Sequence, residues 1–142
     1  MLPFKINEMS GFRVLQVLPQ GGVVLVDGTS GDMTKSTYVL VSIGSGAPEL
    51  PDERANFARE LLSTAPLRAV NVTGSEPMRI AGMQGNEIRG QAQGLNGEPV
   101  NLVQWVRFGS GGFLRVIGVG PREGWDDMFT RLRGIRDGVA TR

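Results

Sequence analysis

The chain has 142 residues, with 15 Lys and Arg against 14 Asp and Glu for a formal net charge of +1, and it has no cysteine or histidine. This length suits one domain, and 40% hydrophobic with 20% charged residues is typical of an ordinary globular protein. The two missing residue types exclude disulfides, thiolate chemistry, Cys or His metal ligation and every Ser-His triad.

The charged residues are spread along the chain without a basic cluster, so we expect no nucleic-acid partner. The longest apolar run is Val23 to Val26, and we therefore expect neither a signal peptide nor an integral membrane segment in this sequence. The composition leaves the compartment open. It would be periplasmic or exported if a leader has been removed, and cytoplasmic otherwise.

The first half of the chain predicts three strands and a helix. The strand-like runs cover 12–18, 22–27 and 37–43. Between the last two, "DGTSGD" (27–32) is predicted to be a solvated loop, because the twelfth position of a calcium-binding loop counted from its first Asp is a Tyr. From 51 to 65 the apolar residues recur at helical spacing, and Pro66 ends the predicted helix.

The second half predicts a run of strands and a closing helix. The strand candidates are 68–73, 77–83, 85–93, 99–108 and 113–119. Trp125, Phe129, Leu132 and Ile135 then recur at helical spacing. Because the loops between successive strands are short, neighbouring strands should be antiparallel, and the fold class is α+β.

The stretch "GFLRVIGVGPREGWDDMF" (112–129) has the outline of a nucleotide-binding loop between a strand and a helix. Gly118, Gly120 and Gly124 are spaced one residue too widely for the dinucleotide fingerprint, and no further strand can follow in a parallel unit. The acidic residues at the start of the helix would repel a phosphate. We predict a plain turn, and no cofactor or metal.

Catalysis without histidine would have to rely on carboxylates, as in glycoside hydrolysis. The 14 acidic residues are scattered, and no spacing singles out a pair. No serine lies in the G-x-S-x-G setting of a nucleophile elbow. We therefore expect no catalytic residues and a protein that is not an enzyme, with a carboxylate-dependent hydrolase as the weaker alternative.

Two loops, "GLNGE" (94–98) and "GSGG" (109–112), predict how three strands pair if both are hairpins. The predicted partners are Phe108–Phe113, Val106–Arg115, Gln104–Ile117, Ile88–Gln104 and Ala92–Val100. Since partners share a face of the sheet, this register assigns every side chain of the three strands to one of two faces.

One of these faces is mixed in character, with a tryptophan among arginines and polar residues. Trp and Arg are enriched in protein interfaces, so this face, if exposed, would be an interaction surface. Its candidate binding residues are Trp105, Arg107, Arg89, Glu87 and Asn101. The alternative is that a helix covers the part around Leu114 and Val116 while arginine stems lie over the tryptophan.

The other face is apolar except for Gln104 and Arg115. A ligand pocket needs a few placed polar groups in an apolar setting, so these two residues suggest a pocket between helix and sheet. The alternative is that they only satisfy each other with a hydrogen bond at the sheet edge.

Four segments carry a family resemblance: "RIAGMQGNEIRGQAQ", "VNLVQWVRF", "GFLRVIGVGP" and "EGWDDMFTRLRGIRDGV". They resemble the second half of the PsbP-like α/β/α sandwich, shared by extrinsic photosystem II proteins, a Ran-binding nuclear transport factor and bacterial domains of unknown function. Gly82, Gly85, Trp125 and Phe129 occupy the family's motif positions, and the likeness covers 76–139 best. The resemblance implies one such domain over 1–142, with helices on both sides of an antiparallel sheet.

The known members of that family mostly bind proteins. The sequence therefore predicts a non-enzymatic binding module with a protein partner, as a monomer or weak homodimer. A small-ligand binder or carrier is the main alternative.

Overall fold

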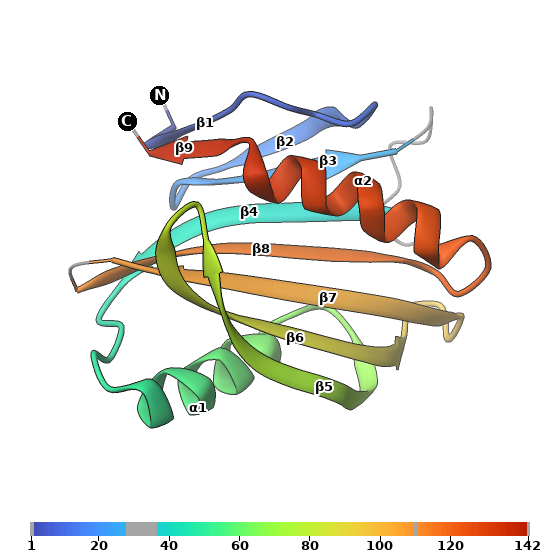
Figure 1. Cartoon of the computed structure of the whole chain (residues 1–142). Helices are drawn as coiled ribbons and strands as arrows, with labels where there is room; N and C mark the ends of the chain where they lie inside the picture. Colours follow the sequence, from blue (N-terminus) through green and yellow to red (C-terminus); the bar gives the residue numbers. More distant parts are fainter. Residues whose placement is uncertain (1, 28–36, 110, 142) are drawn as a thin grey trace.

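The computed structural model describes residues 2–27, 37–109 and 111–141. It contains a seven-stranded antiparallel sheet in the order β2-β3-β4-β8-β7-β6-β5, a small sheet of β1 and β9, and two helices (Figure 1). The elements are β1 (Phe4–Ile6), β2 (Arg13–Leu18), β3 (Gly22–Val26), β4 (Tyr38–Ser45), α1 (Pro51–Leu62), β5 (Arg68–Ile80), β6 (Met83–Gln93), β7 (Pro99–Phe108), β8 (Gly112–Pro121), α2 (Trp125–Asp137) and β9 (Val139–Thr141).

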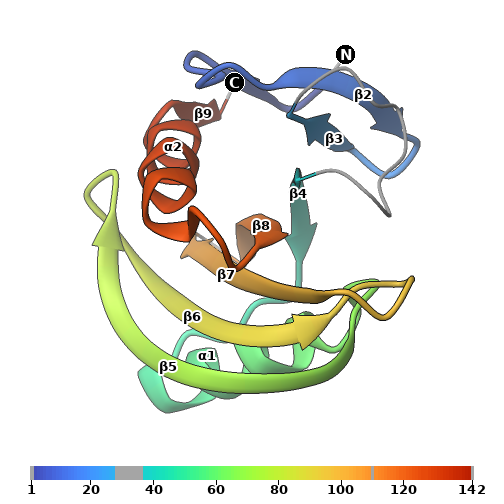
Figure 2. The same ribbon diagram turned by 90° about the vertical axis from the view of Figure 1, so that its right-hand side faces the viewer.

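The large sheet is curved, and α2 lies on the inner side of the curve (Figure 2). On this α2 face, Trp105 and Val116 of the central strands pack with Leu132 and Ile135 of the helix. The helix comes very close to β8 at Gly118, where an added Cβ would lie 2.7 Å from a methyl group of Leu132. A glycine in β8 is thus what allows α2 to contact the sheet backbone.

The opposite, α1 face has its own core, in which Ala58 and Leu62 of α1 pack with Ile88, Leu102 and Ile117 of the sheet. The helix begins at Pro51, a residue whose fixed φ suits the first helical turn, and acidic residues follow in that turn. A helix on each face of an antiparallel sheet makes an α/β/α sandwich, as the sequence predicts.

The predicted hairpin register is confirmed. Phe108 pairs with Phe113, Gln104 pairs with both Ile117 and Ile88, and Ala92 pairs with Val100. The two candidates at 68–73 and 77–83 are instead one long strand, β5, because register shifts between Arg68 and Asn71 and between Val72 and Gly74 let the chain stay paired with β6.

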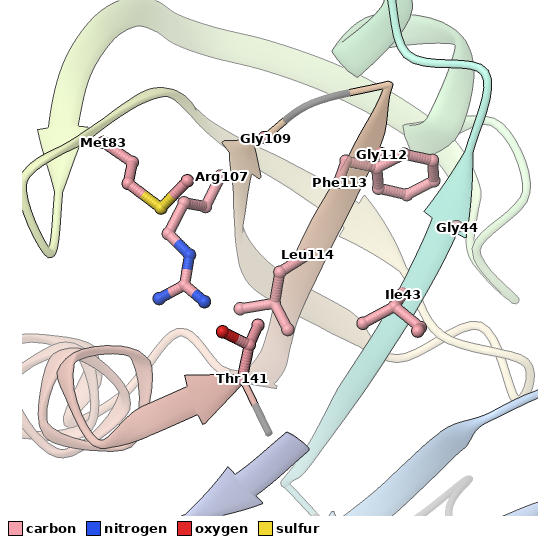
Figure 3. Close-up of a pocket in the computed structure, with 9 residues that line it drawn as sticks. All are labelled: Ile43, Gly44, Met83, Arg107, Gly109, Gly112, Phe113, Leu114 and Thr141. Carbon is pink, nitrogen blue, oxygen red and sulfur yellow. The ribbon is translucent and has the colours of Figure 1, made fainter. Parts of the chain in front are cut away.

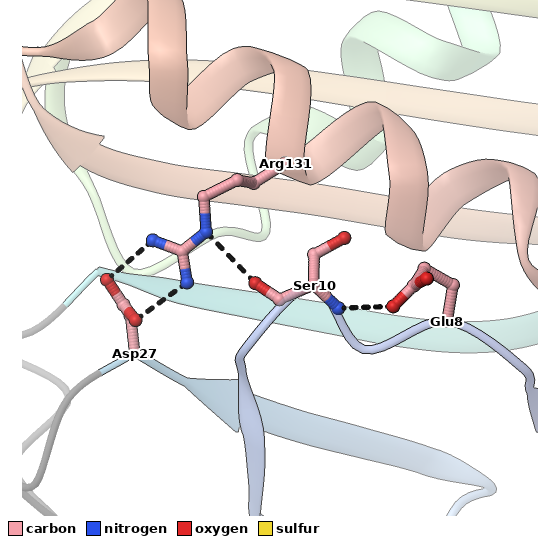
Figure 4. Close-up of polar contacts among 4 residues, drawn as sticks. All are labelled: Glu8, Ser10, Asp27 and Arg131. Atoms are coloured by element: carbon pink, nitrogen blue, oxygen red, sulfur yellow. Dashed lines mark hydrogen bonds and ion pairs between the residues drawn. The ribbon is translucent and has the colours of Figure 1, made fainter.

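Arg131 of α2 forms hydrogen bonds to the N-terminal part of the chain (Figure 4). Its guanidinium donates two hydrogen bonds to the carboxylate of Asp27, at 2.8 and 3.0 Å, and one to the carbonyl oxygen of Ser10 at 2.9 Å. The hydrogen bonds to Asp27 raise the pKa of Arg131. This cluster joins β3, the segment before β2 and the last helix.

The turn before α2 is the plain strand-to-helix turn that the sequence predicts. Gly118 and Gly120 belong to β8, and Gly124 precedes α2 with a positive φ of 74° that favours glycine. The predicted loop at 27–32 lies outside the described residues from position 28 onward. Neither helix of the described chain has the length and apolar character needed to cross a bilayer.

Candidate functional site: the polar rows of the sheet and a pocket at Arg107

The mixed face of the sheet is the α2 face, and its tryptophan is covered. Trp105 is 1% exposed, with the ring of Phe129 at 5.6 Å and the guanidinium of Arg136 at 4.9 Å. Its indole Nε1 donates a 2.8 Å hydrogen bond to Oε1 of Glu87, which is also buried. At Trp105 the structure therefore matches the alternative in which a helix and an arginine cover this face, since Phe129 and Arg136 of α2 lie over the ring.

The remaining residues of the predicted interaction surface do not form one open patch. Arg89 donates a 2.8 Å hydrogen bond to the second oxygen of Glu87, stacks on Phe129 at 4.4 Å and keeps 54% of its side chain exposed. Asn101 is half-buried and Arg107 is buried. Binding of a partner by these residues stays a prediction, with Arg89 as its accessible member.

Gln104 and Arg115 lie between α1 and the sheet as predicted, and their hydrogen bonds join each other and the helix. Arg115 donates to Oε1 of Gln104 at 2.8 Å, to the hydroxyl of Thr64 at 3.0 Å and to the carbonyl of Leu61 at 2.8 Å. Gln104 donates to the carbonyl of Ala58 at 2.8 Å. Both carbonyls lie in the second half of α1, and that of Leu61 belongs to the last turn, whose carbonyls find no N–H partner within the helix.

Burial lowers the pKa of Arg115 to about 10, while the nearby Tyr38 phenol acts in the opposite direction. Burial, followed by the charge of Glu98, raises the pKa of Tyr38 to about 12, and Arg115 opposes this rise. At neutral pH the guanidinium is therefore charged and the phenol is neutral. The bonds of Arg115 and Gln104 form a hydrogen-bond network under α1. This is the alternative that the sequence left open, although it lies on central strands and not at the sheet edge.

A pocket of about 240 Å³ opens on the α2 face beyond the end of α2 (Figure 3). Ile43, Leu114 and Arg107 are direct neighbours across β4, β8 and β7, so their side chains form one row on this face. Phe113, Met83 of β6 and Thr141 of β9 complete its wall. The row is left uncovered by the helix because the chain leaves α2 at Asp137 and continues as β9.

Arg107 is the one charged residue in the described lining of this pocket. It is 7% exposed, and its Nη1 donates a 3.2 Å hydrogen bond to the carbonyl of Val139. Burial lowers the pKa of Arg107. Within residues 2–27, 37–109 and 111–141, no carboxylate forms an ion pair with it.

Sequence reasoning placed Arg107 and Leu114 on the same face, but it missed the contributions of Ile43 and Thr141. The strand β9 has only three residues, which is too short to show an alternation of apolar and polar residues. Its partner β1 lies at the other end of the chain, so no nearby sequence pattern predicts the pairing. The pocket could therefore be found only from the folded structure.

No family model matches the sequence, and a search of curated proteins finds no match. Solved structures do match. LpqN of Mycobacterium tuberculosis, described as involved in cell envelope biogenesis, superposes with a TM-score of 0.70 at 15% identity, over 98% of this chain and 83% of that one.

Two further matches carry the family names that the sequence suggests. The Ran-binding protein Mog1p of Saccharomyces cerevisiae has a TM-score of 0.59 at 10% identity, covering 92% of this chain and 86% of that one. The cyanobacterial PsbP of Synechocystis sp. PCC 6803 has a TM-score of 0.57 at 11% identity, covering 100% and 94%. The chain thus has the PsbP-like fold, and the resemblance seen in the sequence is confirmed at the level of the fold.

Proposed function

We propose that this chain is a non-catalytic module that binds an extended segment of a partner protein along β2, the end strand of the large sheet. The observation that carries this proposal is the exposure of two valines there. Val14 is 49% exposed and Val17 is 58% exposed, on a strand whose outer side pairs with no other described strand. An open edge with apolar side chains is a template for strand addition.

The two valines point to the same side of the sheet. Val14 pairs with Leu25 and Val17 pairs with Val23, because the register shifts between Val14 and Gln16. About half of the backbone N–H and C=O groups of an edge strand point away from its neighbour and can bond to an added strand. An incoming segment would gain main-chain hydrogen bonds from β2 and apolar contact from the valine pair.

The other edge of the sheet, β5, is less suited to an added strand. It contains Pro77, which has no N–H to donate, and charged residues such as Glu76 and Arg79. Two register shifts also interrupt its pairing with β6. Proline, charge and bulges are the features by which proteins protect edge strands, so the two edges differ in the way that a binding edge and a protected edge would.

A partner segment fits β2 better than a second copy of this chain does. In a two-fold pair of β2 strands, both members would carry the irregularity at Leu15, and the ladder between them would be interrupted twice. Stable homodimers also bury about 1,200–2,000 Å² or more, far beyond a six-residue strand with two half-exposed valines.

The comparison with solved structures supports a binding role in general terms, since one neighbour is described as a Ran-binding protein. The described lining of the Arg107 pocket holds no carboxylate or lysine, so it offers no general base of the usual kinds to activate the one hydroxyl there, that of Thr141. Both points favour a module that binds over one that catalyses.

The test is site-specific crosslinking in a native lysate, with a photoreactive phenylalanine analogue at Gln16 on β2 or at Glu76 on β5, both exposed. We expect the probe on β2 to crosslink to a segment of a partner protein. Val17→Lys should abolish this crosslink, because a charged side chain at an edge disfavours strand addition. The matched control is Val70→Lys on β5, where the valine is 38% exposed.

Crosslinks that form from β5 and not from β2, or that survive Val17→Lys, would contradict the proposal. Crosslinks between two copies of the chain would assign the edge to a homodimer instead. Thermal unfolding of each variant confirms that the compared proteins are folded.

A further inference from the structure

The pocket at Arg107 is separate from the β2 edge. We propose that it binds a small organic carboxylate, with the carboxylate on the guanidinium of Arg107 and an apolar body against Ile43 and Leu114. The proposal rests on three features of the described residues: a buried cation without an ion-pair partner, an apolar wall beside it, and a cavity between the two.

The charge of Arg107 is the first feature. The residue is only 7% exposed, and in the described chain a single carbonyl accepts one of its five N–H donors. Buried charges are normally paired, because removing a charge from water is unfavourable without a counter-charge. Figure 3 shows the guanidinium pointing into the space between Met83, Leu114 and Thr141. A planar fork of donors in this position matches a carboxylate.

The apolar wall selects an organic anion over an inorganic one. Ile43 is 37% exposed and Met83 is 41% exposed, so the pocket keeps large apolar surfaces accessible at its rim. Thr141 provides the other polar side chain in the described lining. Phosphate or sulfate would leave this apolar surface in water, whereas a carboxylate with a hydrocarbon body would cover it.

The volume limits the size of the ligand. At roughly 30 Å³ for each water-sized group, a cavity of about 240 Å³ holds about eight non-hydrogen atoms. Hexanoate has this size and is the probe that we would use. A ligand this small is expected to bind in about the millimolar range.

The measurement uses the methionine methyl groups as reporters in carbon-proton NMR spectra. Met83 lines the pocket, whereas Met128 in the first turn of α2 belongs to the cluster around that helix and serves as the internal control. Sodium hexanoate is titrated at constant ionic strength to about 50 mM, well above the expected dissociation constant. Hexanol tests the tail without the charge, and sodium phosphate tests the charge without the tail.

Three variants separate the pocket from nonspecific effects. Arg107→Met removes the charge and keeps most of the stem. Gly109→Leu places a side chain at the pocket wall, where an added Cβ meets only the terminal methyl of Met83, at 3.6 Å. Arg122→Met changes the net charge by the same amount at an exposed arginine, in the turn between β8 and α2, at the opposite end of β8 from the pocket.

We expect the Met83 methyl signal to shift saturably with hexanoate, and to shift at least about tenfold more weakly with hexanol or phosphate. The shift should disappear in Arg107→Met and Gly109→Leu and remain in Arg122→Met. No saturable Met83 shift in the wild-type chain would overturn the proposal, as would an equal shift in Arg107→Met. Equal responses to phosphate and hexanoate would overturn the assignment to an organic carboxylate.

Discussion

The contact between α2 and β8 predicts a specific cost for adding one methyl group at Gly118. A Cβ there would lie 2.7 and 2.9 Å from the two methyl groups of Leu132 and 3.3 Å from its Cγ. Ordinary carbon–carbon contacts begin about 0.5–1 Å further out, and Leu132 is fully buried, so it cannot move into solvent. Overpacking of this kind destabilises a core by about 1–3 kcal/mol, and we expect that loss for Gly118→Ala.

A double-mutant cycle tests the cause of this loss. Leu132→Ala alone should lower the free energy of unfolding by about 2–5 kcal/mol, since it leaves a cavity under α2. In that background Gly118→Ala should cost almost nothing, giving a coupling of about 1–3 kcal/mol. The assay is urea unfolding followed by tryptophan fluorescence. Additive effects of the two substitutions would refute the close approach of helix and strand.

Two further predictions concern the network under α1. Arg115→Met should lower the free energy of unfolding by about 1–3 kcal/mol in urea denaturation, because Oε1 of Gln104 stays buried without this donor and the bonds to Thr64 and Leu61 are lost. Arg122→Met, at an exposed position, should change it by less than about 0.5 kcal/mol. An equal loss in both variants would contradict the network. Tyr38 is the single tyrosine, so absorbance near 295 nm reports its ionisation directly. Because burial raises the pKa of Tyr38 from 10.0 to about 12, the unfolded chain loses its phenolic proton first as the pH rises. The contribution of Tyr38 to stability should therefore be complete below pH 10 and lost, by about 2–3 kcal/mol, as the pH rises through 12. Half-ionisation near pH 10 in a chain that circular dichroism shows to be folded would contradict this assignment.

The local pairing of the central strands could be predicted from the sequence, because short hairpin loops fix a register and the register fixes the faces. The partners of Gln104 and Phe108 follow directly from the two loops. The α+β class follows from the same short loops. Helical spacing from Trp125 onward similarly predicts α2.

The exposure of a face could not be predicted in the same way, since it depends on where distant elements pack. Trp105 shares its sheet face with arginines and polar residues, a composition found in protein interfaces. The ring is nevertheless covered, because Phe129 and Arg136 of α2 pack over it. For the same reason the Arg107 pocket was missed, because its wall depends on β9, a three-residue strand that pairs with the other end of the chain. The exposure of Val14 and Val17 follows from the strand order, which places β2 at an end of the sheet.

The central claim, that β2 receives a strand from a partner, is tested most directly by amide hydrogen exchange of the chain alone and with the protein that crosslinks to β2. Outward-facing amides between Arg13 and Leu18 should exchange at least about tenfold more slowly in the complex, while those of β5 keep their rates. Protection along β5 or around Arg89, with no change in β2, would contradict the claim.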